Sequence, residues 1–308
     1  MQSLRFVSHH VIASGIMAKK PTNARKRFAS PRAEFLSAAF MSFWMNTIGV
    51  ELALVRPFLE NTLGFTNVDA QGLFLALLFT HLCFFFGPFY GKKSRGALNN
   101  PAVYFLFYLT GDADADTASK GALSAVFGTI VGTFAYEKTS RVVVPLIITS
   151  TTGFSKGIVP AVAAGGSVRG AASEATVAFL NFLFAGVAPR LVGDAMAPYA
   201  GAFFYVITVV IEKCRYSCGF MNPAVVLATH VVGGDVFSPD AAKHVLTYAT
   251  GAGLGAVAAA AAKAVADGKV PGSKPAKHAT SGKTKAKTKA STTTPARISA
   301  RTRKPKAA

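Results

Sequence analysis

The residues whose types and spacing suggest chemistry belong to one short motif that occurs twice. The tetrapeptide Asn-Pro-Ala-Val lies at 100–103 and again at 222–225. An asparagine before a proline is a helix-start pattern, because the asparagine side chain caps free backbone amides and proline at the first helical position loses no hydrogen bond. Each copy therefore predicts the start of a helix, and the chemistry it offers is binding at helix ends.

No other group of residues has the spacing of a catalytic or metal site. The three cysteines fit neither a disulfide framework nor a common zinc pattern. Asp112, Asp114 and Asp116 resemble the first half of a calcium loop, but Leu123 stands where the closing glutamate should be. We interpret this run as a solvated helix start. The sequence predicts no enzyme activity, no cofactor and no metal site.

The helix that follows each motif is too short to cross a membrane. The apolar stretches end near residues 110 and 231, whereas a full span needs about 20 residues. Two half-helices at corresponding positions in the two halves of a chain indicate an inverted repeat, with a site near the membrane midplane where the helix N-termini meet. A channel or a transporter is built in this way.

Six longer apolar segments must position these half-helices. With 51% hydrophobic residues and a mean hydropathy of +0.37, the 308-residue chain is too apolar for an ordinary soluble domain. One half-helix follows the second segment and the other follows the fifth. The predicted fold is an all-α membrane protein with six transmembrane helices and two half-helices in an inverted three-plus-three repeat. The segments lie at about 31–54, 70–90, 118–136, 172–189, 197–212 and 244–262.

The link between the two halves, residues 138–171, is predicted to be a loop. It contains a short apolar stretch at 142–148, which is too short to be a further span. The third and sixth segments are rich in glycine, which permits close helix contact within a subunit or between subunits.

The net charge of +19 is concentrated in the two tails. Residues 1–33 hold seven basic and no acidic residues, and residues 263–308 hold thirteen basic residues and one acidic residue. We predict a basic disordered segment at 1–29, a membrane domain at 30–262 and a disordered Lys/Ala/Thr-rich tail at 263–308. The last of these has no aromatic residue to stack on bases, so contact with anionic lipid headgroups is favoured over nucleic acid.

The distribution of positive charge and the even number of spans place both termini in the cytoplasm. Residues 1–16 lack acidic residues and precede Met17. They are either a weak organelle-targeting segment or an upstream extension of a protein that starts at Met17.

The paired motifs resemble those of the aquaporin, or major intrinsic protein, family, and the resemblance covers residues 30–262. The first span opens with Ala33-Glu34-Phe35-Leu36, as in many members, and Glu174 opens the first span of the second half. Gly96 and Gly219 precede the two motifs, as glycines do in family loops.

The resemblance implies a passive channel for water or small neutral solutes, with no catalysed step, assembled as a homotetramer with one pore per subunit. Two positive helix ends would face each other at the midplane and repel cations. Glu34 and Glu174 would accept hydrogen bonds from the backbone of the motif loops, since a carboxylate within a span needs a partner. The pore motifs would be Asn100, Pro101, Ala102, Asn222, Pro223 and Ala224, with the asparagine amides donating into the pore.

The chain departs from the family pattern at its selectivity filter. Most members have an arginine where this chain has Val225. By family spacing, the other filter positions are Val210 and Gly219, with Phe79 or Thr80 from the second span. Such a filter is apolar and wide. Water entry would be slow because an apolar constriction dewets, while glycerol, urea or hydrogen peroxide would pass more easily.

Tyr104 stands where the family usually has a small residue, and it could narrow the pore from inside. With Val225 it motivates one alternative, a membrane structural protein of this fold that conducts poorly. A second alternative, an ion-coupled transporter, should carry a charged residue near the half-helix tips. Neither motif has one within four residues.

Loss of the arginine together with basic tails resembles the unorthodox branch of the family, the superaquaporins and small basic intrinsic proteins, which are mostly intracellular. The end of the chain, Lys304-Pro305-Lys306-Ala307-Ala308, resembles a dilysine retrieval signal. We therefore expect an integral, multi-pass protein of an intracellular membrane such as the endoplasmic reticulum, with the plasma membrane as the alternative.

Overall fold

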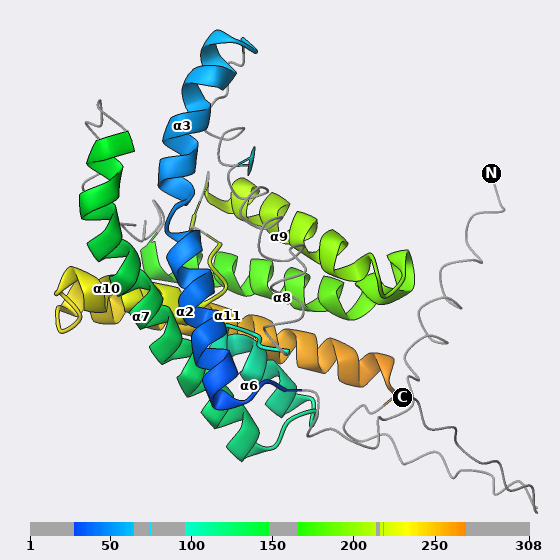
Figure 1. Ribbon diagram of the computed structural model, residues 1–308. Coiled ribbons are helices and arrows are strands. Elements are labelled where there is room, and N and C mark those ends of the chain that lie inside the picture. The colour runs from blue at the N-terminus through cyan, green and yellow to red at the C-terminus, as the bar shows by residue number, and fades with distance from the viewer. Residues whose placement is uncertain are drawn as a thin grey trace, which may run out of the picture. The chain divides into compact units, whose positions relative to one another are not determined.

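The structure is a computed structural model that describes residues 28–64, 74–75, 96–147, 166–213, 216–217 and 219–268. Within these residues every long element is an α-helix and there is no strand (Figure 1). The prediction of an all-α protein is confirmed for this part of the chain. The helices are α2 (Pro31–Met45), α3 (Ile48–Asn61), α6 (Pro101–Leu109), α7 (Ala115–Ile147), α8 (Gly166–Val192), α9 (Ala197–Lys213), α10 (Pro223–Gly233) and α11 (Pro239–Ala266).

The segment expected as one span at 31–54 forms two helices. Helix α2 begins after Ser30, whose side chain accepts a hydrogen bond from the Ala33 amide, and it ends at Met45. Asn46 stands at the break and donates from its side chain to the Ser42 carbonyl at 2.7 Å and to the Thr133 hydroxyl at 3.4 Å. Helix α3 then continues to Asn61. The second expected span, 70–90, lies outside the described residues except for 74–75.

The prediction of a loop over 138–171 is wrong at both ends. Helix α7 runs on to Ile147, and α8 already begins at Gly166. The extension of α7 carries an ion pair at helical spacing, in which the Arg141 guanidinium lies 2.6 Å from the Glu137 carboxylate. Such pairs support an exposed helix, and a search for apolar residues alone overlooks them. The remainder of the link lies outside the described residues.

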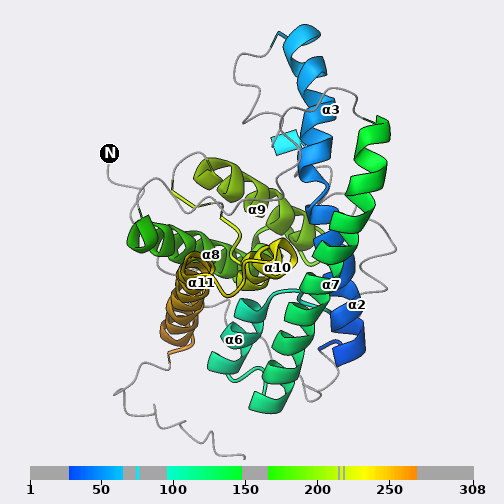
Figure 2. The ribbon, with the colours of Figure 1, turned by 90° about the vertical axis from the view of Figure 1, so that its left-hand side faces the viewer.

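Two long helix pairs make the closest contacts, α2 with α7 and α8 with α11 (Figures 1 and 2). Gly128 of α7 lies against α2, where an added Cβ would overlap the Phe35 carbonyl oxygen and lie 2.9 Å from the Ala38 Cβ. Gly255 of α11 lies against α8 in the same way, where an added Cβ would lie 2.7 Å from the Ala175 carbonyl oxygen. Most glycines of the third and sixth segments therefore serve packing within the chain, while an added Cβ on Gly253 would meet nothing within 4 Å.

Among the described residues, two helices are long and apolar enough to cross a membrane. They are Ser167–Val192 in α8 and Pro239–Ala266, which is α11. Helix α9 is apolar but shorter, with 17 residues. Helix α11 continues past residue 262, to Ala266.

Candidate functional site

The two Asn-Pro motifs open two half-length helices, as their sequence predicts. Asn100 Oδ1 accepts from the Ala102 amide at 2.9 Å, and α6 follows with nine residues. Asn222 Oδ1 accepts from the Ala224 amide at 3.1 Å, and α10 follows with eleven residues. At 1.5 Å per residue each helix is about 15 Å long, which is half of a membrane hydrocarbon core.

The two motifs touch each other through their asparagine side chains. Asn100 Nδ2 donates to the Met221 carbonyl oxygen at 2.9 Å. Asn222 Nδ2 donates to the Asn99 carbonyl oxygen, also at 2.9 Å. Each asparagine amide therefore caps its own helix through its oxygen and donates one N–H to the backbone beside the other motif. Since an amide nitrogen carries two N–H groups, each asparagine keeps one donor beyond this contact.

The residue before each capping asparagine has a left-handed backbone. Asn99 has φ of 55° and Met221 has φ of 50°. Asparagine tolerates this region, but for methionine it is uncommon, so the surrounding contacts must hold the loop in place. The contacts that do so come from two buried carboxylates.

Glu34, near the start of α2, is fully buried and supports the loop of the first motif. Its Oε1 accepts from the Asn99 amide at 2.6 Å, and its Oε2 accepts from the Leu98 amide at 2.9 Å. Oε2 also accepts from the Tyr104 hydroxyl at 2.7 Å. The carboxylate thus has three donors, which offsets the cost of its burial.

Glu174 of α8 is fully buried and supports the loop of the second motif. Its Oε2 accepts from the Met221 amide at 2.8 Å, and its Oε1 accepts from the Phe220 amide at 3.1 Å. Oε1 also accepts from the Ser217 hydroxyl at 2.7 Å. Both carboxylates therefore hold the two backbone amides that directly precede a capping asparagine. The family resemblance implies this kind of contact for Glu34 and Glu174.

Sequence reasoning missed the third partner of each carboxylate. Tyr104 is 1% exposed, and its ring fills the space beside Gly121, where an added Cβ would overlap it. Its hydroxyl thus supports the first loop. In the second half, the Ser217 amide donates to Glu212, a second buried carboxylate. The signal for Glu212 was present, since an acidic residue at the end of an apolar segment needs a partner.

Among the predicted filter positions, Val210 lies on α9 and Gly219 lies against the same helix. Gly219 has φ of 59°, and a Cβ there would lie 3.3 Å from the Val209 Cα and 3.4 Å from the Glu212 Cβ. Val210 packs at the edge of an apolar cluster that includes Val209 and Met221. Val225 is half-buried in the first turn of α10. Phe79 and its alternative Thr80 lie outside the described residues.

No group of three or more His, Cys, Asp or Glu side chains within the described part of the chain is arranged to hold a metal ion. Comparison of the sequence with protein-family models gave no match, and comparison with curated proteins also gave none. The interpretation of this site therefore rests on its residues and their contacts.

Proposed function

We propose that the chain is a passive membrane channel of the aquaporin type, which conducts water or small neutral solutes. One observation carries the proposal. Two asparagines from motifs far apart in the sequence each donate to the backbone of the other motif, at the N-terminal ends of two half-length helices.

The proposed pore follows from the chemistry of these helix ends. The N-terminus of a helix carries a partial positive charge of about half an elementary charge, so two such ends side by side repel cations. The remaining N–H of each asparagine amide would donate to a polar solute that passes. A neutral solute with oxygen acceptors, such as water, glycerol, urea or hydrogen peroxide, suits this arrangement.

The proposed architecture is an inverted three-plus-three repeat, and matching contacts in the two halves support it. The Leu98 and Asn99 amides donate to Glu34 as the Phe220 and Met221 amides donate to Glu174. The helix packing matches as well. Gly128 lies against Phe35 and Ala38, which are one and four residues after Glu34. Gly255 lies against Ala175 and Ala178, which are one and four residues after Glu174.

A multi-pass membrane location is part of the proposal. Besides two helices of spanning length, the bundle exposes apolar faces on several helices. A soluble monomer rarely exposes so much apolar surface, whereas lipid tails would cover it. On α2 and α7 the exposed side chains recur every three or four residues: Leu36, Phe40, Trp44, Leu123, Phe127, Val131 and Phe134. A homotetramer, cytoplasmic termini and lipid contact by the basic tails complete the proposal.

A membrane protein of this fold that conducts poorly is the second candidate. The observation that favours it is Val225, since valine supplies no donor at the place where an arginine would bind the solute. The buried Glu212 near the second motif raises the separate question of ion coupling, which a flux measurement with and without an ion gradient answers.

The test is solute flux in vesicles of the purified full chain. Vesicles are shrunk with an impermeant osmolyte and then with glycerol or urea, and light scattering follows their volume. We expect faster shrinkage and re-swelling than in empty vesicles, without any ion gradient. Val225→Arg should slow glycerol and urea, because it narrows the filter, and Val142→Arg, at an exposed position on α7, is the matched control. Flux equal to that of empty vesicles, with correctly assembled protein, would favour the structural role.

A further inference from the structure

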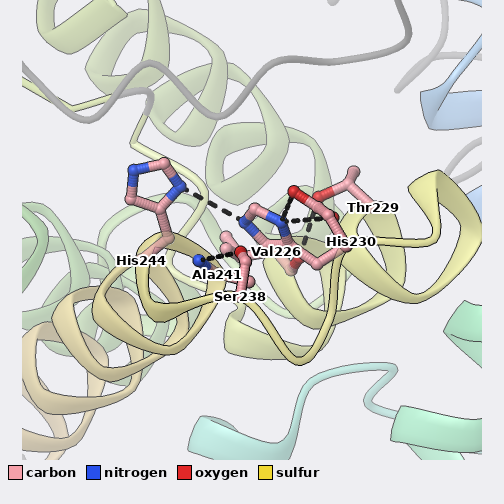
Figure 3. A network of polar contacts seen from close by, with 7 residues as sticks. Val226, Thr229, His230, Ser238, Ala241 and His244 are labelled. Atoms are coloured by element: carbon pink, nitrogen blue, oxygen red, sulfur yellow. Dashed lines mark hydrogen bonds and ion pairs between the residues drawn. The ribbon is translucent and has the colours of Figure 1, made fainter.

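A histidine pair, with His230 buried and His244 partly exposed, joins the second half-helix to the last long helix (Figure 3). His230 lies in the last turn of α10 and is 6% exposed. Its Nε2 lies 3.2 Å from Nδ1 of His244, which is in the second turn of α11. On its other side, His230 Nδ1 lies 2.9 Å and 3.1 Å from the two carboxylate oxygens of Asp235.

The turn between α10 and α11 holds these groups in place. The Gly234 and Asp235 amides donate to the His230 carbonyl oxygen, and Gly234 has the left-handed backbone that ends a helix. The Ser238 amide donates to the Asp235 carbonyl oxygen at 2.8 Å, and the Ser238 hydroxyl accepts from the Ala241 amide at 3.0 Å. The two imidazole rings are therefore held near each other by a short turn whose backbone is fixed by hydrogen bonds.

The contacts fix where the protons of the pair can lie. A carboxylate only accepts, so His230 Nδ1 carries a proton that it donates to Asp235. When both rings are neutral, His230 Nε2 is an acceptor and His244 Nδ1–H donates to it. One added proton keeps the contact, because an N–H of the charged ring then donates to the neutral ring. A second added proton places two N–H groups and two positive charges face to face, and the contact is lost.

We propose that this histidine pair is an acid-sensitive latch on the second half-helix. The latch is closed while the pair holds at most one extra proton, and it opens when both rings are charged. Because α10 begins directly after Asn222 and carries Val225, its release from α11 would loosen the second motif and lower the flux through the proposed pore. The effect on flux rests on the proposed function, whereas the opening of the latch does not.

The charged side chains that act on His244 are Asp235, Asp240 and Lys243, together with the His230 ring when it is protonated. Imidazoles change charge between about pH 5 and 8, and this range sets the pH values at which the latch is tested.

Helices α6 and α7 pack against α10, and α6 and α8 pack against α11. Helix α8 carries Arg169, Glu174 and Arg190. None of the charges that act on His244 comes from α6, α7 or α8. Helix α6 has no acidic or basic residue, and the Tyr104 hydroxyl is bonded to Glu34. The ionic contacts of α7 lie within that helix, between Lys120 and Asp116, between Arg141 and Glu137, and between Lys138 and the ring of Phe134.

The test combines hydrogen exchange with flux in the same vesicles of the full chain. Backbone exchange of residues 223–234 is measured at about pH 7.5 and about pH 5, on either side of the histidine range, and is divided by the intrinsic rate at each pH. We expect exchange in α10 to rise about fivefold in acid, a typical size for coupling between sites, while osmotic flux falls. His244→Gln should remove this pH dependence. His278→Gln, which changes a histidine of the basic tail, should keep it.

The outcomes separate the latch from the channel. A rise in exchange with no flux at either pH would support the latch and reject the channel. Flux at both pH values with no change in the exchange of α10 would reject the latch and leave the channel. Equal exchange at the two pH values in the unmodified protein overturns the latch by itself, even if the variant does not fold. A pH dependence that survives in His244→Gln also overturns it.

Discussion

At the scale of single residues, buried carboxylates determine the shape of the site. Glu34 and Glu174 each accept hydrogen bonds from two backbone amides of the loops that lead to the half-helices. Because these loops are irregular, their amides have no hydrogen-bond acceptor in a helix or a sheet. A loop of this kind inside a membrane needs acceptors from the protein. The carboxylates thus allow irregular backbone to persist beside two helix ends, and this is what makes a polar site available there.

Tyr104→Phe tests this account of Glu34. The change removes one of three donors to a buried carboxylate, and we expect a loss of about 1 to 3 kcal/mol in the free energy of unfolding. Unfolding of the detergent-solubilised protein, followed by circular dichroism, measures it.

Tyr108→Phe is the matched control for this variant, since Tyr108 is 48% exposed on the same half-helix. Equal stability of the two variants would show that the hydroxyl of Tyr104 contributes nothing to the loop.

Asp235→Asn tests the order of protonation in the histidine pair. The amide removes the negative charge beside His230, so the pair takes up its protons only at lower pH. Where hydrogen exchange of α10 increases in acid in the unmodified protein, the same increase should require more acid in this variant. If the pH at which exchange of α10 rises were unchanged or higher in this variant, the Asp235 carboxylate would not be the group that favours protonation of the pair.

At the scale of elements, small residues set the distance between the long helices. Gly128 and Gly255 let α2 meet α7 and α8 meet α11 at backbone contact. Without a strong hydrophobic drive between helices in lipid, such close packing is a main source of association. These helix pairs carry Glu34 and Glu174, so the packing also fixes where the two carboxylates lie relative to the motif loops.

Gly255→Ala should therefore destabilise the protein. The added Cβ would lie 2.6 Å from the Ala178 Cβ, and we expect a cost of about 1 to 3 kcal/mol from overpacking. Gly253→Ala in the same helix meets nothing within 4 Å, and it should gain up to about 1 kcal/mol from helix propensity. Denaturant titration of the two variants side by side measures both. Similar shifts in the same direction would contradict the packing account.

The elements also show what the sequence could predict. The starts of α6 and α10 follow from Asn-Pro chemistry, and their short length follows from the apolar stretch behind them. The break after Met45 did not follow, because Asn46 is stabilised by Thr133, which is distant in sequence. The extension of α7 beyond residue 138 was also missed, because its support comes from charged rather than apolar residues.

Side-chain direction was the least predictable part of the site. Tyr104 was considered from the sequence as a residue that narrows the pore, yet its hydroxyl contacts Glu34 and its ring fills the space beside Gly121. The ring fits there because Gly121, on α7, has no side chain. No pattern in the sequence around Tyr104 indicates this. The histidine pair likewise depends on the turn between α10 and α11, so neither histidine stands out in the sequence.

At the scale of the whole molecule, the chain combines a neutral helical domain with strongly basic tails. The contacts divide it into residues 1–270 and 271–308. Residues 271–308 hold eleven basic residues and no acidic residue, whereas residues 34–262 hold thirteen basic and thirteen acidic residues and are neutral. We therefore expect the domain to fold and to conduct without the tail.

Deletion of residues 271–308 tests this expectation. The free energy of unfolding should change by less than about 0.5 kcal/mol, as for surface changes away from packed residues, and the flux per protein should stay the same. Denaturant titration and light scattering on vesicles made without anionic lipid measure the two quantities. A large loss in either one would show that the tail belongs to the working domain.

The central claim is that the two facing asparagines form a conducting site. The most direct measurement is re-swelling in glycerol or urea of vesicles that contain equal amounts of unmodified protein or of the double variant Asn100→Ala, Asn222→Ala, with helix content checked by circular dichroism. We expect re-swelling well above that of empty vesicles for the unmodified protein and a fall toward the empty-vesicle rate for the folded double variant. Equal rates for the unmodified protein and empty vesicles, or for the unmodified protein and the double variant, would contradict it.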